Sequence, residues 1–146
     1  MPTHADIVTE ARSWVGVRYQ HQASVKGVAC DCIGLVRGVG RACGLVDPFT
    51  TGEAARYSGY ERSPNSRLLL EACAAFLNPI SLAAAIPGDV LTFRFDADAQ
   101  HFGILSAINP RYVIHSYAQA RRVVENRIDD LWASRIVGAY HLRGVN

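Results

Sequence analysis

Asp31-Cys32-Ile33-Gly34-Leu35-Val36 is the stretch that decides the fold. Apolar residues at helical spacing follow a turn-rich segment here and predict a helix from Cys32 to about Cys43, ending at Gly44. Aspartate is a favoured N-cap residue, so Asp31 is expected to cap this helix and place Cys32 in its first turn. Free backbone N–H groups and the helix dipole there lower the pKa of a thiol, whereas the charge of Asp31 opposes this. The alternative on these residues alone is a small buried core cysteine.

Two histidines further along the chain can supply a base for such a thiol. The segments 101–105 and 111–115 are rich in β-branched and aromatic residues, which predicts two strands, and the Asn-Pro between them predicts a turn. If Leu105 pairs with Arg111, the hairpin places His101 opposite His115 on one face, with Cβ atoms about 5 Å apart. A thiol at a helix start with these two side chains forms a nucleophile, a base and an orienting residue.

These motifs resemble the NlpC/P60 family of cell-wall cysteine peptidases, with Asp-Cys-x-Gly-Leu-Val at 31–36, His-x-Gly-Ile at 101–104 and Ile-His at 114–115. Gly16-Val17-Arg18-Tyr19 is similar to the family's Gly-x-x-Tyr, and Pro87-Gly88-Asp89-Val90 to its Pro-Gly-Asp-Leu turn. The run 19–32, which ends in Cys-Asp-Cys, is similar to the phage-encoded branch of the family. The resemblance covers nearly the whole chain.

The resemblance implies an α+β, papain-like fold: a mostly antiparallel sheet packed by helices, with the nucleophilic cysteine at a helix N-terminus. Cys32 would be the nucleophile, His101 its base and His115 the residue that orients the base. Tyr19 would line the nucleophile's pocket, and Tyr19 and Asp31 are the candidate substrate-binding residues.

The resemblance also implies the substrate, which is the peptidoglycan stem peptide, commonly cleaved between D-γ-glutamate and diaminopimelate or lysine. Many family members carry a serine directly after the nucleophile, where it helps to shape a substrate subsite. This chain carries Ile33 instead, so the scissile bond stays open. Two alternatives to a peptidase remain: an amidase or acyltransferase of the same superfamily, and a non-catalytic tail or wall-binding component. The intact cysteine and histidine set argues against the last of these.

Composition bounds the remaining possibilities. A chain of 146 residues is expected to form one catalytic domain, residues 1–146, and a net charge of +2 does not indicate nucleic acid. No apolar run approaches the roughly 20 residues that span a bilayer. Met1–Asp6 lacks a signal-peptide pattern, so the chain is expected to be made in the cytoplasm and to act on the cell wall within a phage or phage-like tail, with tail proteins as partners.

Four cysteines raise the question of disulfides or zinc. The chain is not a cysteine-dense scaffold, and the one-residue spacing of Cys30 and Cys32 lacks a second ligand pair, so neither a cofactor nor a metal is expected. Cys43 and Cys73 are expected to be core thiols.

Periodicity predicts the other elements. A first helix is expected at 3–15 with Trp14 in the core, and a loop at 16–30 in which His21 is a second site candidate, more simply a surface or hydrogen-bonded histidine. A long loop at 45–65 contains Tyr57 and Tyr60, which either line a groove or anchor the loop. A third helix is expected at 66–77, strands at 90–95, 122–125 and 135–142, and a helical turn near 129–132. Asp96 and Asp98 read as a solvated turn rather than a calcium loop.

Overall fold

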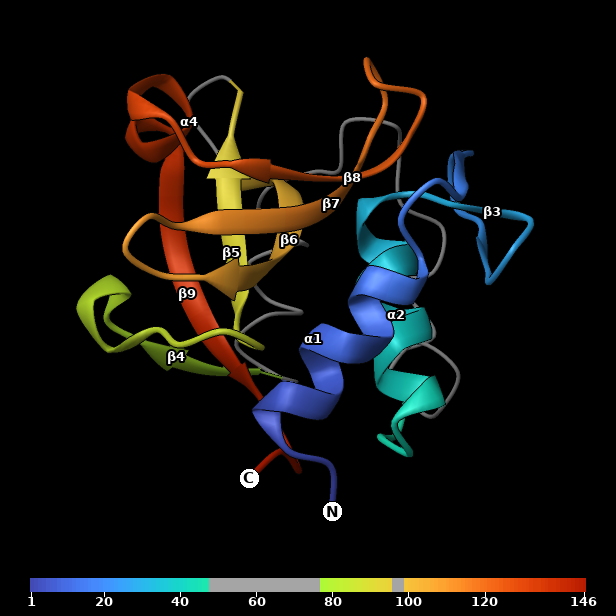
Figure 1. Ribbon diagram of the computed structural model, residues 1–146, viewed down its shortest axis with the longest axis horizontal. Helices are drawn as coiled ribbons and strands as arrows, with labels where there is room; N and C mark the ends of the chain where they lie inside the picture. Colours follow the sequence, from blue (N-terminus) through green and yellow to red (C-terminus); the bar gives the residue numbers. More distant parts are fainter. Residues whose placement is uncertain (48–76, 96–98) are drawn as a thin grey trace.

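A computed structural model describes residues 1–47, 77–95 and 99–146 of the chain. Two helices, α1 (His4–Ser13) and α2 (Cys32–Ala42), lie beside one large sheet (Figure 1). The α+β prediction is confirmed. Tyr57, Tyr60, Cys73 and the turn with Asp96 and Asp98 fall outside the described residues. So does the expected third helix at 66–77, except for its last residue, Leu77, which begins a strand instead. Within the described ranges, no helix is long and apolar enough to cross a membrane.

The sheet contains nine strands in the described part of the chain, in the order β2-β3-β1-β8-β7-β6-β5-β9-β4. Only the pair of β1 and β3 is parallel among the paired strands described, so the sheet is mostly antiparallel as predicted. The strands are β1 (Arg18–Tyr19), β2 (Ser24–Val25), β3 (Ala29–Cys30), β4 (Leu77–Ile80), β5 (Val90–Arg94), β6 (Ala99–Ala107), β7 (Tyr112–Tyr117), β8 (Arg122–Arg127) and β9 (Ile136–Leu142).

Two parts of this sheet were not predicted. The segment 16–30, expected as a loop, contributes the three short strands β1, β2 and β3, because its backbone finds partners in β8 and within itself. β4 was also missed, since Pro79 weakens a strand pattern. It lies at the edge of the sheet, where a missing N–H is tolerated. The helical turn predicted near 129–132 is confirmed as α4 (Asp130–Ser134), and a short 3₁₀ helix, η3 (Leu82–Ala84), precedes β5.

Two glycines of α2 allow close contacts with neighbouring segments. A Cβ on Gly38 would lie 2.3 Å from the ring of Trp14, and a Cβ on Gly34 would lie 1.9 Å from the carbonyl oxygen of Ala23. The two glycines therefore admit α1 and the segment before α2. Trp14 is 2% exposed, which confirms it as a core residue.

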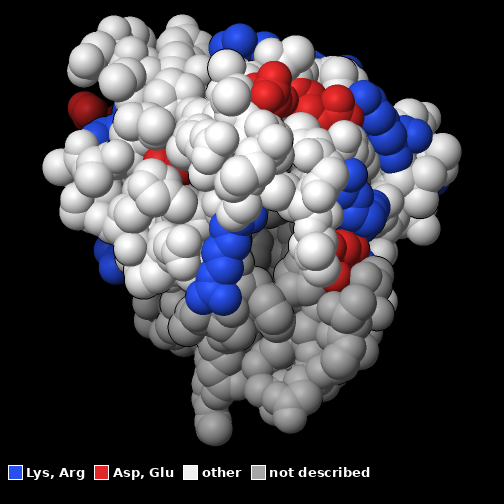
Figure 2. Space-filling model, turned by 90° about the horizontal axis from the view of Figure 1, so that it is seen from below, with Lys and Arg blue, Asp and Glu red and all other residues white. Residues whose placement is uncertain are grey.

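Charged side chains of both signs are interspersed on the described part of the face shown in Figure 2. This distribution fits the small net charge of +2. A mixed surface does not generate the single-sign field that attracts nucleic acid. The expectation that nucleic acid is no partner stays a prediction.

Candidate active site

The start of α2 carries the first candidate residue. Asp31 is the N-cap as predicted, and one of its carboxylate oxygens accepts a hydrogen bond from the backbone N–H of Gly34 at 2.7 Å. The other oxygen accepts from the backbone N–H of Gln22 at 2.7 Å and lies 3.9 Å from Nδ1 of His21. Cys32 is then the first residue of the helix. Asp31, only 1% exposed, thus fixes the helix start to the preceding segment, and its substrate-binding role stays a prediction.

Two contacts hold this helix start against the middle of the sheet. The Ser116 hydroxyl on β7 donates a hydrogen bond to the carbonyl oxygen of Cys30 at 2.7 Å. A backbone hydrogen bond from Phe102 on β6 reaches the thiol of Cys32. Because Phe102 directly follows His101, the thiol lies against the strand segment that carries the predicted base. The structure therefore brings Cys32 and the histidine strands together.

His101 and His115 contact each other from the neighbouring strands β6 and β7, although the strands do not pair in the predicted register. Nε2 of His101 lies 2.7 Å from Nδ1 of His115. Ile104 pairs with Ile114 and Leu105 with Val113, so the predicted pairing of Leu105 with Arg111 is wrong by two residues. A register irregularity between Leu105 and Ala107 absorbs the difference near the turn. A shift of two residues preserves the face of a strand, so the histidines still share one face and contact each other diagonally.

Gly103 makes this diagonal contact possible. A Cβ on Gly103 would lie 2.4 Å from Cγ2 of Val113 and 3.3 Å from Cβ of His115. The first distance is too short for any side chain. The glycine of the His-x-Gly motif therefore lets β7 approach β6 closely beside the histidine pair.

Asn126 on β8 extends the pair to a relay of three side chains, and sequence reasoning missed it. Its Oδ1 lies 2.6 Å from Nε2 of His115, and its Nδ2 donates to the carbonyl oxygen of Arg127 at 3.1 Å, which fixes the orientation of the amide. Oδ1 is an acceptor only, so Nε2 of His115 carries the proton and the neutral ring presents a bare Nδ1 to His101. Nε2 of His101 then donates to that Nδ1, which leaves Nδ1 of His101 as the basic nitrogen.

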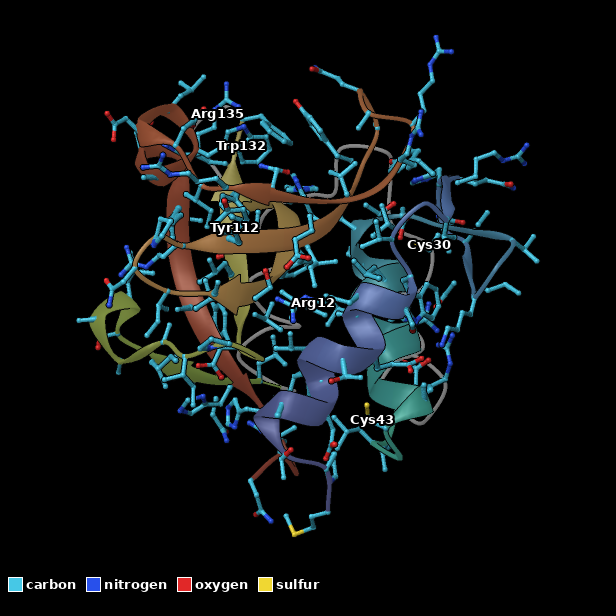
Figure 3. The ribbon with its side chains drawn as sticks, viewed as in Figure 1. Arg12, Cys30, Cys43, Tyr112, Trp132 and Arg135 are labelled. Carbon is cyan, nitrogen blue, oxygen red and sulfur yellow. The ribbon has the colours of Figure 1, made fainter. Side chains whose placement is uncertain are left out.

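Aromatic rings surround the histidine pair. The ring centroids of His115 and Tyr117 lie 5.4 Å apart in a stacked arrangement, and those of His101 and Phe95 lie 5.4 Å apart. Trp132 of α4 packs edge-on against His115 at 5.1 Å. Arg135, beside Trp132 in Figure 3, places its guanidinium 5.3 Å from that indole ring. Sequence reasoning missed this aromatic wall because its members come from three separate segments.

Burial changes the expected charge state of the site. It raises the pKa of the Cys32 thiol to about 12, and the nearby Asp31 carboxylate adds to the rise. Backbone hydrogen bonds from Phe102 and the helix start lower this pKa, but by less. The predicted lowering of the Cys32 pKa is therefore wrong. Burial, and secondly His115, holds the pKa of His101 well below its ordinary value, so thiol and imidazole are both neutral near pH 7.

Of the remaining residues, Tyr19 and Ile33 lie near the start of α2, and Cys43 lies at its other end. Tyr19 is half-buried and pairs across the parallel strands β1 and β3 with Cys30, which lies two residues before Cys32. The pocket-lining role of Tyr19 stays a prediction. The Ile33 side chain is 3% exposed and belongs to the hydrophobic core. Cys43 caps the far end of α2, away from Cys30 (Figure 3), and is half-buried rather than a core thiol.

Comparison with known proteins places this arrangement in a fold. No family model matches the sequence, and no curated protein matches it either. Solved structures do match. An NlpC/P60 family protein from Bacillus cereus has a TM-score of 0.69 at 16% identity, over 97% of this chain and 40% of that one. The chain has the NlpC/P60 fold.

Two further structures with this fold belong to proteins of different activity. The NlpC/p60 domain of the peptidoglycan hydrolase SagA has a TM-score of 0.64 at 20% identity, over 96% of this chain and 99% of that one. RipD from Mycobacterium tuberculosis, a non-catalytic NlpC/p60 domain protein adapted to peptidoglycan binding, has a TM-score of 0.60 at 12% identity, over 97% of both chains. The chain therefore covers nearly the whole length of these two structures but only about two fifths of the length of the Bacillus cereus protein.

Proposed function

We propose that this chain is a cysteine peptidase that hydrolyses an amide bond in the peptidoglycan stem peptide. The observation that carries the proposal is the relay of His101, His115 and Asn126, which leaves one basic imidazole nitrogen beside the strand segment that touches the Cys32 thiol. A packing role for two histidines does not require a third side chain that fixes both tautomers.

The reaction begins from the neutral pair. Nδ1 of His101 takes the proton of the Cys32 thiol as the sulfur attacks the amide carbonyl, so the thiolate forms only during attack. Backbone N–H groups at the start of α2 stabilise the oxyanion. The His101 imidazolium keeps its Nε2–H bond to His115 and then gives its Nδ1 proton to the departing amine. Water next attacks the thioester, His101 again takes the proton, and the acid product leaves with the thiol restored.

The substrate follows from the motif resemblance and from the peptidoglycan hydrolase among the structural neighbours. The bond between D-γ-glutamate and diaminopimelate or lysine is the proposed point of cleavage. The Ile33 side chain lies in the core, so it does not replace the subsite serine that many family members carry. The similarity of residues 19–32 to the phage-encoded branch supports action on the cell wall within a phage or phage-like tail.

Digestion of purified muropeptides with mass spectrometry of the products tests this function. The wild-type chain should release fragments whose masses identify the D-γ-glutamyl bond, and Cys32→Ala should release none. Cys43→Ala, at the other end of α2, is the matched control and should cleave normally. Cleavage by Cys32→Ala would refute the proposed nucleophile. Products cut at another amide, or acyl transfer from simple esters or lipids, would support the amidase or acyltransferase alternative.

A non-catalytic wall-binding role is the second candidate. It is favoured by the likeness to RipD and by the raised pKa of Cys32, since a buried neutral thiol is a poor nucleophile. In that case wild type and Cys32→Ala would sediment equally with purified cell walls, and neither would release product. Turnover by the wild type would exclude this role as the whole function.

A further inference from the structure

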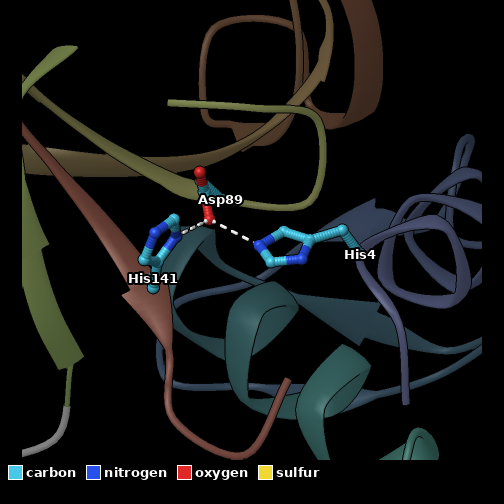
Figure 4. A group of neighbouring side chains, drawn as sticks. All are labelled: His4, Asp89 and His141. Atoms are coloured by element: carbon cyan, nitrogen blue, oxygen red, sulfur yellow. Dashed lines mark hydrogen bonds and ion pairs between the residues drawn. The ribbon is translucent and has the colours of Figure 1, made fainter. Parts of the chain in front are cut away.

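Three side chains outside the candidate active site converge on one another, as Figure 4 shows: His4, Asp89 and His141. His4 begins α1, Asp89 directly precedes β5, and His141 lies in β9. Nε2 of His4 is 3.0 Å and Nδ1 of His141 is 2.5 Å from the same oxygen of Asp89, Oδ1. The side chain of Asp89 is fully buried, whereas those of His4 and His141 are 18% and 37% exposed.

The hydrogen bond of His4 to Asn146 leaves Nε2 of its neutral ring as an acceptor that faces another acceptor, Oδ1 of Asp89. Nδ1 of His4 lies 2.8 Å from the backbone carbonyl oxygen of Asn146, which can only accept, so Nδ1 carries the proton. A neutral His4 ring therefore directs the bare lone pair of Nε2 at a carboxylate oxygen, which is also an acceptor. A proton or a metal cation must therefore lie between these two atoms.

The backbone is shaped to hold this cluster. Gly88 has a φ of +102°, and a Cβ there would lie 2.7 Å from the carbonyl oxygen of His4, so only glycine allows α1 to start this close to Asp89. The second oxygen of Asp89, Oδ2, accepts from the backbone N–H of Ile86 at 2.8 Å. The two carboxylate oxygens thus have separate roles, because Oδ2 fixes the turn while Oδ1 faces the histidines.

We propose that His4, Asp89 and His141 form a binding site for a divalent transition-metal cation, with Zn²⁺ as the best match. Two imidazoles and one carboxylate are a ligand set that Zn²⁺ uses, and their ligand atoms all lie within 4.8 Å of one another. Bonds of about 2.0–2.2 Å from one zinc place its ligand atoms roughly 3–3.6 Å apart. To bind the ion, His141 must move its Nδ1 away from Oδ1 of Asp89, which is 2.5 Å away, and the 37% exposure of its side chain leaves room for this movement.

The contacts around the cluster match those of metal ligands. A ligating histidine typically donates its other ring N–H to a backbone carbonyl, which fixes the ring, and His4 does this with Asn146. The exposure of His141 leaves a side of the site open to solvent for a fourth ligand. Sequence reasoning missed this site because it looked for ligands at close spacing, and these three residues are separated by 85 and 52 positions along the chain.

The role of the cation is structural in this proposal. His4 N donates to the carbonyl oxygen of Asn146, and Asn146 N donates to that of Pro2, so the two ends of the described chain already lie side by side. A metal bound to His4, Asp89 and His141 would tie these ends to β9 and to the turn before β5. Because folded protein alone has this geometry, binding should stabilise the fold.

Metal titration of the full chain tests the proposal. The protein is stripped with a chelator, kept reduced, and titrated with ZnCl₂ by calorimetry and thermal melt. We expect one Zn²⁺ per chain and a rise in Tm of about 5–10 °C when free Zn²⁺ is roughly 100 times Kd. Co²⁺ should give visible d–d bands without a thiolate-to-cobalt charge-transfer band, which separates this site from the cysteines.

Substitution of the most exposed ligand provides the decisive comparison. His141→Ala should fold, as a thermal melt without metal checks, and should lose both the Zn²⁺ binding and the Tm rise. His21→Ala replaces a half-buried histidine outside the cluster and should bind as the wild type does. Zn²⁺ binding that persists in His141→Ala, a thiolate band with Co²⁺, or no binding by the wild type would each overturn the proposal. A shared proton, rather than a metal cation, would then lie between Nε2 of His4 and Oδ1 of Asp89.

Discussion

Asn126 offers the sharpest test of the relay, because only the structure assigns it a role. Removing its side chain in Asn126→Ala deprives Nε2 of His115 of its acceptor at 2.6 Å. The buried His115 ring can then adopt the other tautomer, in which Nδ1 carries the proton and donates toward His101. His101 would have to accept that bond on Nε2 and carry its own proton on Nδ1, where the base is needed.

The magnitude follows from the lost hydrogen bond. A neutral hydrogen bond contributes about 0.5–1.5 kcal/mol, and each 1.36 kcal/mol is a factor of ten in an equilibrium or a rate. Asn126→Ala should therefore lower kcat on muropeptides by about 2- to 13-fold, with a smaller effect on KM. Asn78→Ala is the matched control, since Asn78 is an exposed asparagine on β4 that accepts a hydrogen bond from Arg143 at 3.1 Å.

Asn126→Asp separates positioning from simple stability. The amide of Asn126 already raises the pKa of His115 against the lowering by burial, and a carboxylate at this position should raise it further. A protonated His115 would donate from Nδ1 and reverse the relay. The acid limb of the kcat profile should thus move to higher pH in Asn126→Asp. Unchanged kcat and pH profile in both folded variants would refute the assignment of the relay.

Four further outcomes follow from the site. His101→Ala should lose orders of magnitude in turnover and should react more slowly with iodoacetamide at Cys32. His115→Asn and His115→Gln should retain more turnover than His115→Ala, because their carbonyl oxygens still accept a hydrogen bond from His101. Normal turnover in His101→Ala would mean that the two roles are reversed. Because the pKa values of His101 and His115 are lowered in the folded state, the unfolded chain binds protons first as pH falls below about 6.5. The Tm should therefore fall with acidification, and it should fall less steeply in folded His101→Ala. Equal slopes of Tm against pH in this variant and the wild type would contradict the role assigned to burial. The raised pKa of Cys32 acts at the other end of the range, since the unfolded thiol ionises near 9.0 and the folded one near 12, so stability should fall above pH 9.0 and Cys32→Ser should reduce that loss. Turnover below Tm should survive EDTA, because a thiol and an imidazole carry the proposed chemistry; a loss restored by zinc would place the metal in the mechanism.

The sequence by itself determined the local features whose causes lie within a few residues. An aspartate before an apolar helix pattern is enough to predict the cap and to place Cys32 in the first turn of α2. Period-two patterns with turn residues between them predict β5 to β9, and a strand period of two places His101 and His115 on one face under either register.

Only the tertiary structure decided the register, the third member of the relay and the charge state of the thiol. The pairing of β6 with β7 depends on the irregularity near Ala107 and on the close approach at Gly103. Asn126 reaches His115 because β8 pairs with β7, which no local pattern encodes. The pKa of Cys32 rises because the folded sheet removes water from a residue that the helix start alone would have left ionisable. Local interactions depend on neighbours in sequence, whereas desolvation and side-chain contacts across strands depend on which distant segments pack together.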